Sequence, residues 1–221
     1  MVAGRIAMTT PPAVPLAVIV LAAGSGTRMT SDLHKVLHPI AGRSMLLHLL
    51  DTVSALSPER VVVVTGARSE QVEAAVAPLG VRAVRQAEQL GTGHAVLQAE
   101  PALAGFSGDV LILYGDVPLV AAATMRRMIE ALQAGGGASA VVLGFRPADP
   151  AAYGRVIADD AGRIDRMVEF KDADADERRV TLCNSGLMAV RSSDLWRLLA
   201  KVGNDNAAGE FYLQHTLHCC R

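Results

Sequence analysis

The chain has 221 residues, of which 51% are hydrophobic and 19% are charged, and its formal net charge is −1. This apolar content excludes an intrinsically disordered protein, and the near-neutral charge excludes a broad positive surface that would hold a nucleic acid. No apolar run approaches the roughly 20 residues of a membrane span. We therefore expect a globular protein that binds anionic ligands with local groups and has neither a nucleic-acid nor a membrane partner.

Residues 1–14 are expected to form a flexible tail before a domain over residues 15–221. The apolar run at 16–23 follows Arg5 and also resembles the core of a secretory signal. We favour a buried strand, because the residues after the run fit a phosphate-binding loop. The three cysteines have no CxxC spacing and no disulfide framework, which fits a reducing, cytoplasmic location.

Short apolar runs and helical patterns alternate along the first two thirds of the chain. Strands are predicted at residues 16–21, 61–65, 81–85 and 110–114, and helices at 44–56, 69–77, 92–99 and 123–133. We expect Ser69 to cap the second of these helices. The alternation is typical of an α/β fold with a Rossmann-like, doubly wound, mostly parallel sheet, and the wholly apolar run 110–114 predicts its central strand.

The spacing of the predicted elements changes after the glycines at 135–137. Closer strands are predicted at 140–145, 154–158, 163–169 and 182–190, with a hairpin turn at 159–162. This pattern predicts a mixed sheet whose second half reaches over a ligand site. Ligands of open α/β sheets bind beyond the carboxyl ends of the strands, so the residues that follow each strand are the candidates for chemistry.

The loop after the first strand carries two glycines, whose small size lets backbone N–H groups turn inward around a phosphate chain. This loop begins with Leu21, Ala22, Ala23 and Gly24. Arg28 can add a bidentate contact to phosphate, and Lys35 a compact positive charge near the transferred phosphate. The glycine spacing matches neither the Walker nor the Rossmann pattern, so a simple tight turn and a solvated lysine are the alternative interpretations.

A second polar loop follows the predicted strand at 81–85. The side-chain amide of Gln86 offers a donor and an acceptor, which matches the mixed edge of a pyrimidine base. Gly91 would let the base approach the backbone, and Thr92 could complete the pocket while it caps the next helix. The alternative is a polar loop with a threonine cap and no ligand.

Tyr114, Gly115 and Asp116 end the most apolar strand. A carboxylate at the tip of a central strand is well placed to hold Mg²⁺, which takes few protein carboxylates and fills its other positions with water and phosphate oxygens. Asp116 is therefore the candidate metal ligand, and the alternative is a turn aspartate before Val117.

The later strand boundaries carry Gly154, Glu169 and Asn184. The last two could bond hydroxyl and amide groups of a sugar, because buried polar partners discriminate strongly between sugars. Each of the three is a weak signal when taken alone.

Several motifs occur in order between about Leu16 and Leu213: LAAGSGTRM, HKVLHPIAG, QAEQLGTGHAV, LYGDVPL, YGRVI, VEFKDA, CNSGLMA and NDNAAGEFY. Together they resemble the bacterial N-acetylglucosamine-1-phosphate uridylyltransferases, the pyrophosphorylase half of a bifunctional enzyme of cell-wall precursor synthesis. The resemblance implies that residues 21–24, Lys35, Gln86, Gly91, Thr92 and 114–116 face the nucleotide. It also implies that Gly154, Glu169 and Asn184 face the sugar, and that Asp116 carries magnesium.

Two departures from that family bear on activity. Its β-helix acetyltransferase domain has no counterpart in this sequence, so acetyl transfer is not expected and, without the β-helix contacts, a monomer is expected. The family's second metal ligand, an asparagine, falls beyond Arg221, and the ending HTLHCCR departs from the family pattern, which predicts a truncated or frameshifted chain.

The expected reaction is in-line attack by N-acetylglucosamine 1-phosphate on the α-phosphorus of UTP, with pyrophosphate as leaving group. Arg28 and Lys35 are the candidate catalytic residues. One alternative is a transferase of the same fold that uses CTP with a sugar-alcohol phosphate or GTP with molybdopterin. The other is a nucleotide-binding module without catalytic activity.

Overall fold

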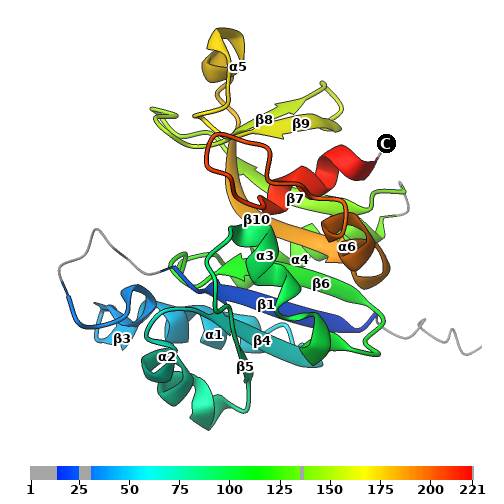
Figure 1. Ribbon diagram of the computed structural model, residues 1–221. Coiled ribbons are helices and arrows are strands. Elements are labelled where there is room, and N and C mark those ends of the chain that lie inside the picture. The colour runs from blue at the N-terminus through cyan, green and yellow to red at the C-terminus, as the bar shows by residue number, and fades with distance from the viewer. Residues whose placement is uncertain (1–13, 25–30, 135–136, 221) are drawn as a thin grey trace, which may run out of the picture.

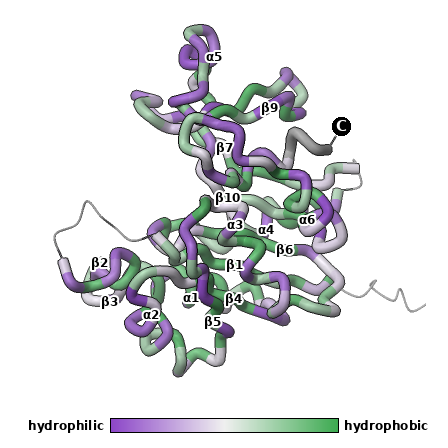
Figure 2. Tube along the Cα trace, in the orientation of Figure 1, coloured by the Kyte–Doolittle hydropathy of each residue, from purple (hydrophilic) through white to green (hydrophobic). Residues whose placement is uncertain are grey.

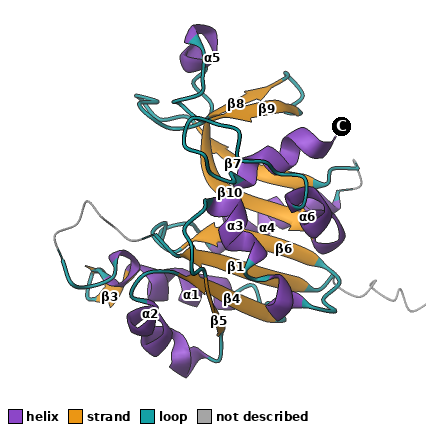
Figure 3. Cartoon of the chain, in the orientation of Figure 1, coloured by secondary structure: helices purple, strands orange, loops and turns teal. Residues whose placement is uncertain are grey.

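The computed structural model describes residues 14–24, 31–134 and 137–220. In these parts of the chain a mixed eight-stranded sheet runs through the molecule, and helices cover it on both sides (Figure 1; Figure 3). The strands follow the order β5-β4-β1-β6-β10-β8-β9, and β7 pairs with β10. Their bounds are β1 Leu16–Ala22, β4 Arg60–Thr65, β5 Arg82–Arg85, β6 Asp109–Tyr114, β7 Ala140–Phe145, β8 Arg155–Ala158, β9 Ile164–Val168 and β10 Cys183–Arg191.

The register of the sheet brings several strand ends to one edge. β1 is parallel to both β4 and β6, and Leu21 lies opposite Val64 on one side and Tyr114 on the other. β10 runs antiparallel to β6, with Met188 opposite Ile112. The first residues of β10, rather than its last, therefore lie at the same edge as the carboxyl ends of the parallel strands. The expected Rossmann-like, mostly parallel first half with a mixed second half is confirmed.

The core lies on both faces of the sheet, because β1 and the part of β6 after Asp109 are hydrophobic (Figure 2) and alternate residues pack on opposite faces. Ile19 packs on one face with residues of α3 (Thr92–Leu97) and α6 (Ser192–Leu199). Val18 packs on the other with α1 (Met45–Ser54), α2 (Ser69–Val76) and α4 (Ala122–Gln133). Both side chains are fully buried, and each such burial stabilises the fold by about 1.5–3 kcal/mol. None of the described helices has the length and apolarity that a membrane span requires.

The start of α2 differs from the prediction. Ser69 is not the N-cap; it is the first residue of the helix and is buried. The cap is Arg68, which adopts a left-handed conformation with φ of 57° and makes no side-chain cap hydrogen bond. Its guanidinium donates to the carbonyl oxygen of Ser31 at 2.8 Å, and the cap lies one residue earlier than predicted.

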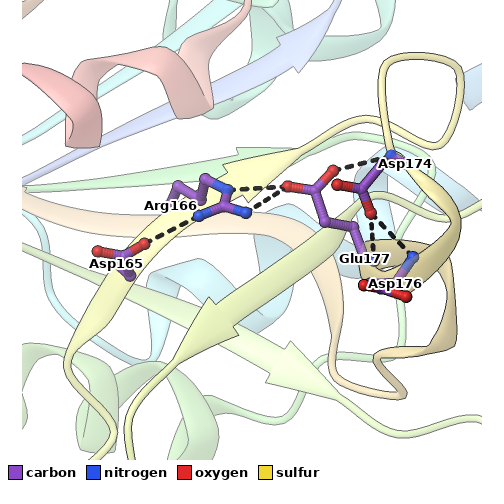
Figure 4. Close-up of polar contacts among 5 residues, drawn as sticks. All are labelled: Asp165, Arg166, Asp174, Asp176 and Glu177. Atoms are coloured by element: carbon purple, nitrogen blue, oxygen red, sulfur yellow. Dashed lines mark hydrogen bonds and ion pairs between the residues drawn. The ribbon is translucent and has the colours of Figure 1, made fainter.

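The strands β8 and β9 and the helix α5 (Ala175–Arg179) form an arm at one end of the molecule (Figure 1). A capping box starts α5: the Asp174 carboxylate accepts from the backbone N–H of Glu177 at 2.8 Å, and the Glu177 carboxylate accepts from that of Asp174 at 2.9 Å. Glu177 also pairs with Arg166 of β9 at 2.7 Å (Figure 4). These contacts fasten α5 to the sheet. The polar segment 172–179 gave no helix prediction, because its helix is defined by capping and has no apolar stripe.

Candidate active site

A cavity of about 260 Å³ opens where β1, β5 and β6 end. Ten of the residues predicted to bind nucleotide line it: Leu21, Ala22, Ala23, Gly24, Lys35, Gln86, Gly91, Thr92, Tyr114 and Asp116. They come from four separate stretches of sequence, and the shared edge of the parallel strands brings them together. Gly115 is packed behind this wall, where its N–H donates to the Leu21 carbonyl oxygen at 2.9 Å. Arg28 lies outside the described residues.

The loop that follows β1 is held close to its neighbours. A Cβ at Gly66, just after β4, would lie 2.3 Å from the carbonyl oxygen of Ala23, so only glycine permits this approach. The side-chain amide of Gln89 donates to the same Ala23 oxygen at 2.9 Å. The start of the predicted phosphate-binding loop, at Ala23, is therefore held in place at the rim of the cavity.

Lys35 and Asp116 form an ion pair inside the cavity. Lys35 begins a short 3₁₀ helix, Lys35–Leu37, and its Nζ donates to Oδ2 of Asp116, two residues past the end of β6. Both side chains stay partly exposed, at 39% and 30%. The pair places a cation suited to phosphate oxygens beside a carboxylate suited to a divalent metal.

Gln86 is buried, and its amide is partly committed to the protein. Its Nε2 donates to the Gly91 carbonyl oxygen at 3.1 Å and contacts Nδ1 of His94 at 3.0 Å. Because the Gly91 oxygen can only accept, the orientation of the amide is fixed. One hydrogen of Nε2 is therefore used within the protein, and the expectation that Gln86 offers a base both a donor and an acceptor stays a prediction.

Gly91 has a backbone conformation with φ of 109° and ψ of 176°, which residues with a Cβ essentially never adopt. A Cβ there would also lie 2.7 Å from the carbonyl oxygen of Phe211. Phe211 in turn accepts from the N–H of Gly93 at 2.7 Å, and its own N–H donates to Leu90 at 2.8 Å. The turn before α3 is thus held against the C-terminal segment.

Tyr114 stands between the first cavity and a second one. Its ring lies against Gly186, where a Cβ would come within 2.6 Å of the ring. The hydroxyl of Tyr114 bonds the Thr92 side chain, which accepts from the N–H of Leu213 at 3.0 Å. Removal of the phenol from water, opposed by the Thr92 bond and reinforced by Glu169 and other acidic groups, raises the pKa of Tyr114 to about 12. Tyr114 therefore stays protonated at neutral pH.

The second cavity, of about 530 Å³, adjoins the first and shares Thr92, Tyr114 and Glu210 with it. It brings together the three residues predicted to bind a sugar: Gly154, Glu169 and Asn184. A Cβ at Gly154 would lie 3.2 Å from Oε1 of Glu169, and the Gly154 carbonyl oxygen accepts from the N–H of Asn184 at 2.9 Å. Their roles stay predictions, but the structure places them in one wall.

Several cavity residues escaped the sequence analysis. Glu210, Gln89, Lys171, Tyr212 and Gln214 line one or both cavities. Gln214 donates to Oε1 of Glu169 from the C-terminal segment. Three of them, Glu210, Tyr212 and Gln214, come after α6 rather than after a strand, so the rule of strand ends does not select them. For four of them a signal existed, since Gln89 lies in the motif QAEQLGTGHAV, Lys171 in VEFKDA, and Glu210 and Tyr212 in NDNAAGEFY.

Comparisons with known proteins agree with this geometry. The model of the MobA-like NTP transferase domain matches residues 18–183. The bifunctional protein GlmU of Rhizorhabdus wittichii is 64% identical over 207 residues, 94% of this chain and 46% of that protein, and GlmU of Novosphingobium aromaticivorans is 66% identical over 199 residues, 90% and 44%. The chain thus spans less than half the length of these relatives.

Solved structures show the same fold. A UDP-glucose pyrophosphorylase complexed with UDP-glucose superposes with a TM-score of 0.73 at 19% identity, over 93% of this chain and 86% of that chain. HddC of Yersinia pseudotuberculosis gives 0.64 at 20% identity, over 90% and 83%. The resemblance seen in the sequence motifs is confirmed by the GlmU relatives, and the chain belongs to the MobA-like NTP transferase domain family.

Proposed function

We propose that the chain transfers a uridylyl group from UTP to N-acetylglucosamine 1-phosphate, giving UDP-N-acetylglucosamine and pyrophosphate. The observation that carries this proposal is the pair of adjoining cavities. One contains the Lys35–Asp116 ion pair at the strand ends, the other is lined by polar groups suited to a sugar, and Tyr114 stands between them. Identity of 64–66% to GlmU proteins supports the choice of substrates.

The first cavity suits a uridine nucleotide. Backbone N–H groups of the loop at 21–24 would surround phosphate oxygens, and Lys35 would add a positive charge. The free carbonyl oxygen of Gln86 would accept from the N3–H of uracil, whereas cytosine presents an acceptor at N3. This acceptor, with Nε2 of the same amide bonded to the Gly91 carbonyl oxygen, favours UTP over CTP.

Asp116 would hold Mg²⁺. The described residues contain no group of three His, Cys, Asp or Glu side chains that could form a complete protein cage. One carboxylate at the mouth of a phosphate cavity still fits this ion, because Mg²⁺ is commonly bound by one or two carboxylates with phosphate oxygens and water. When bound, the ion would neutralise phosphate charge.

The reaction needs alignment more than acid–base chemistry. A phosphate oxygen of the sugar phosphate forms a bond to the α-phosphorus of UTP, and the bond to the bridging oxygen of pyrophosphate breaks in line. The attacking phosphate is already ionised near neutral pH, so no general base is required. Lys35 would reduce the repulsion between the two anions, and we assign the stabilisation of pyrophosphate to Arg28.

We further propose that residues 15–221 act as one nucleotidyltransferase domain, and that it works as a monomer in the cytoplasm. The support is that UTP and sugar phosphates are cytoplasmic metabolites, and that the described residues of one chain bring all predicted ligand groups except Gly115 and Arg28 into the walls of two adjoining cavities. Sedimentation equilibrium at assay concentrations checks the monomer, and a stable dimer would contradict it.

A panel of nucleotides tests the proposed function. The purified chain is mixed with Mg²⁺, N-acetylglucosamine 1-phosphate and one of UTP, CTP, GTP or ATP, and pyrophosphate release is measured by a coupled assay. We expect release with UTP alone. Release with CTP or GTP would indicate a different transferase of this fold. UTP binding by calorimetry without any pyrophosphate release would indicate a binding module.

A further inference from the structure

Arg155, the first residue of β8, is a buried cation with an unusual set of partners. Its side chain is 2% exposed, and no acidic side chain of the described residues pairs with it. Its guanidinium instead donates to backbone carbonyl oxygens: those of Ala151 at 3.1 Å, Pro150 at 3.4 Å, Arg178 at 3.4 Å, and Tyr153. A buried charge is costly unless hydrogen bonds compensate it, so the four carbonyl groups are what keep Arg155 in place.

These bonds hold the loop before β8 in a strained shape. Ala151 has φ of 38°, a left-handed conformation that a residue with a Cβ rarely adopts. The loop is pinned on both sides, because Nη2 of Arg155 bonds the Ala151 carbonyl oxygen and the Asp149 carboxylate accepts from the Ala151 N–H at 2.9 Å. The loop ends at Gly154, which lines the second cavity.

The same guanidinium also contacts the opposite part of the cavity wall. Its Cζ lies 5.5 Å from the centroid of the Phe170 ring, within cation–π range. Phe170 follows Glu169 and lines the second cavity with it. Arg155 therefore bridges the two segments that carry Gly154 and Glu169, although its own side chain lines neither cavity.

We propose that Arg155 is a positioning residue for the acceptor: its planar fork fixes Gly154 against Glu169 and thereby sets the shape of the sugar-phosphate cavity. The proposal rests on the function proposed above. The spacing is tight, since a Cβ at Gly154 would come within 3.2 Å of the Glu169 carboxylate, so a small shift of the loop changes the wall. Lysine retains the charge but cannot reproduce the fork.

Steady-state kinetics of Arg155→Lys provide the first test. We expect the KM for N-acetylglucosamine 1-phosphate to rise by about tenfold to hundredfold, and the KM for UTP to change by less than about twofold. Arg166→Lys is the matched control, because Arg166 fastens the same arm through Glu177 but touches neither cavity wall (Figure 4). Unchanged kinetics in Arg155→Lys, or an equal rise in both KM values, would overturn the proposal.

Asp149→Ala is a second variant, chosen because Asp149 is exposed and its loss does not threaten folding. It removes the other support of Ala151, and we expect a smaller rise in the same KM alone. If Arg155→Lys fails to fold, Asp149→Ala tests the proposal in its place. An unchanged KM for the sugar phosphate in Asp149→Ala would show that the shape of the loop before β8 does not affect acceptor binding.

Amide hydrogen exchange separates this proposal from the proposed function, because it needs no turnover. In Arg155→Lys the amides of Tyr153 and Asn184, which bond the carbonyl oxygens of Pro150 and Gly154, should exchange faster while those of β1 stay unchanged. Absent turnover of the unaltered chain would defeat the proposed function but leave this readout valid. Unaltered exchange at both amides would defeat the positioning role.

Discussion

Replacement of Gly91 by alanine tests how the nucleotide cavity is built. The backbone there has φ of 109° and ψ of 176°, a region almost restricted to glycine, and forcing a residue with a Cβ into it costs about 1–3 kcal/mol. The added Cβ would also lie 2.7 Å from the carbonyl oxygen and 2.8 Å from the nitrogen of Phe211. Such overpacking costs about a further 1–3 kcal/mol, so we expect Gly91→Ala to lose roughly 2–6 kcal/mol of stability.

Gly80→Ala is the matched control for this measurement. Gly80 also has a positive φ, 67°, but a Cβ there would meet no atom within 4 Å. Its cost should be only the left-handed strain of about 1–2 kcal/mol. Urea unfolding of both variants at one pH gives the two free energies. Equal losses at the two positions would refute the close contact between the Gly91 turn and the Phe211 segment.

Three further predictions concern the nucleotide cavity, pH and the arm. Gln86→Leu removes the proposed uracil acceptor, so the KM for UTP should rise by about tenfold or more while the KM for the sugar phosphate stays constant; an unchanged UTP KM would exclude base recognition by Gln86. Burial and the charge of Arg68 lower the pKa of His34 below its usual 6.5, and its Nε2 has no hydrogen-bond partner in the described structure. The folded state therefore binds the proton less well than the unfolded state, so its stability is complete above pH 6.5 and falls as the pH drops below that value. Melting temperatures from pH 7 to pH 5 should show this loss, and His34→Gln should reduce it; an identical pH slope in the variant would rule out His34. Asp174→Ala removes the N-cap of α5 and should lower the free energy of unfolding, measured with urea, by about 1 kcal/mol. An unchanged free energy of unfolding would show that the cap does not stabilise the protein.

The fold was predictable from the sequence because the apolar pattern of each segment and the order of the segments along the chain indicate the same architecture. Apolar runs such as that of β6 are buried on both faces, and their length and spacing predict a doubly wound sheet. The rule that ligands bind beyond strand ends then selected Leu21, Gln86 and Asp116, which line one cavity. Ten of eleven predicted nucleotide residues lie in its wall, and the parallel register explains why.

The remaining features depend on long-range contacts that no local pattern encodes. The bond from Gln86 Nε2 to the Gly91 carbonyl oxygen and its contact with His94 exist only once α3 is in place. Gln214 acts on Glu169 from the C-terminal segment, so its sequence position gave no sign of it. Arg155 directly follows Gly154, but its bond to the Arg178 carbonyl oxygen and its contact with the Phe170 ring exist only in the folded chain. The left-handed entry to α2 at Arg68 is accompanied by a bond from its side chain to Ser31, 37 residues away in the sequence.

The most direct test of the proposed reaction follows an oxygen label. N-acetylglucosamine 1-phosphate that carries ¹⁸O in its non-bridging phosphate oxygens is mixed with unlabelled UTP, Mg²⁺ and either the unaltered chain or Asp116→Ala. The masses of the products are then measured by mass spectrometry. We predict that UDP-N-acetylglucosamine retains all of the label and pyrophosphate contains none, because the sugar phosphate attacks the α-phosphorus of UTP. Asp116→Ala should reduce product formation by about a hundredfold or more without unfolding. Labelled pyrophosphate, or undiminished turnover in the Asp116 variant, would contradict the account.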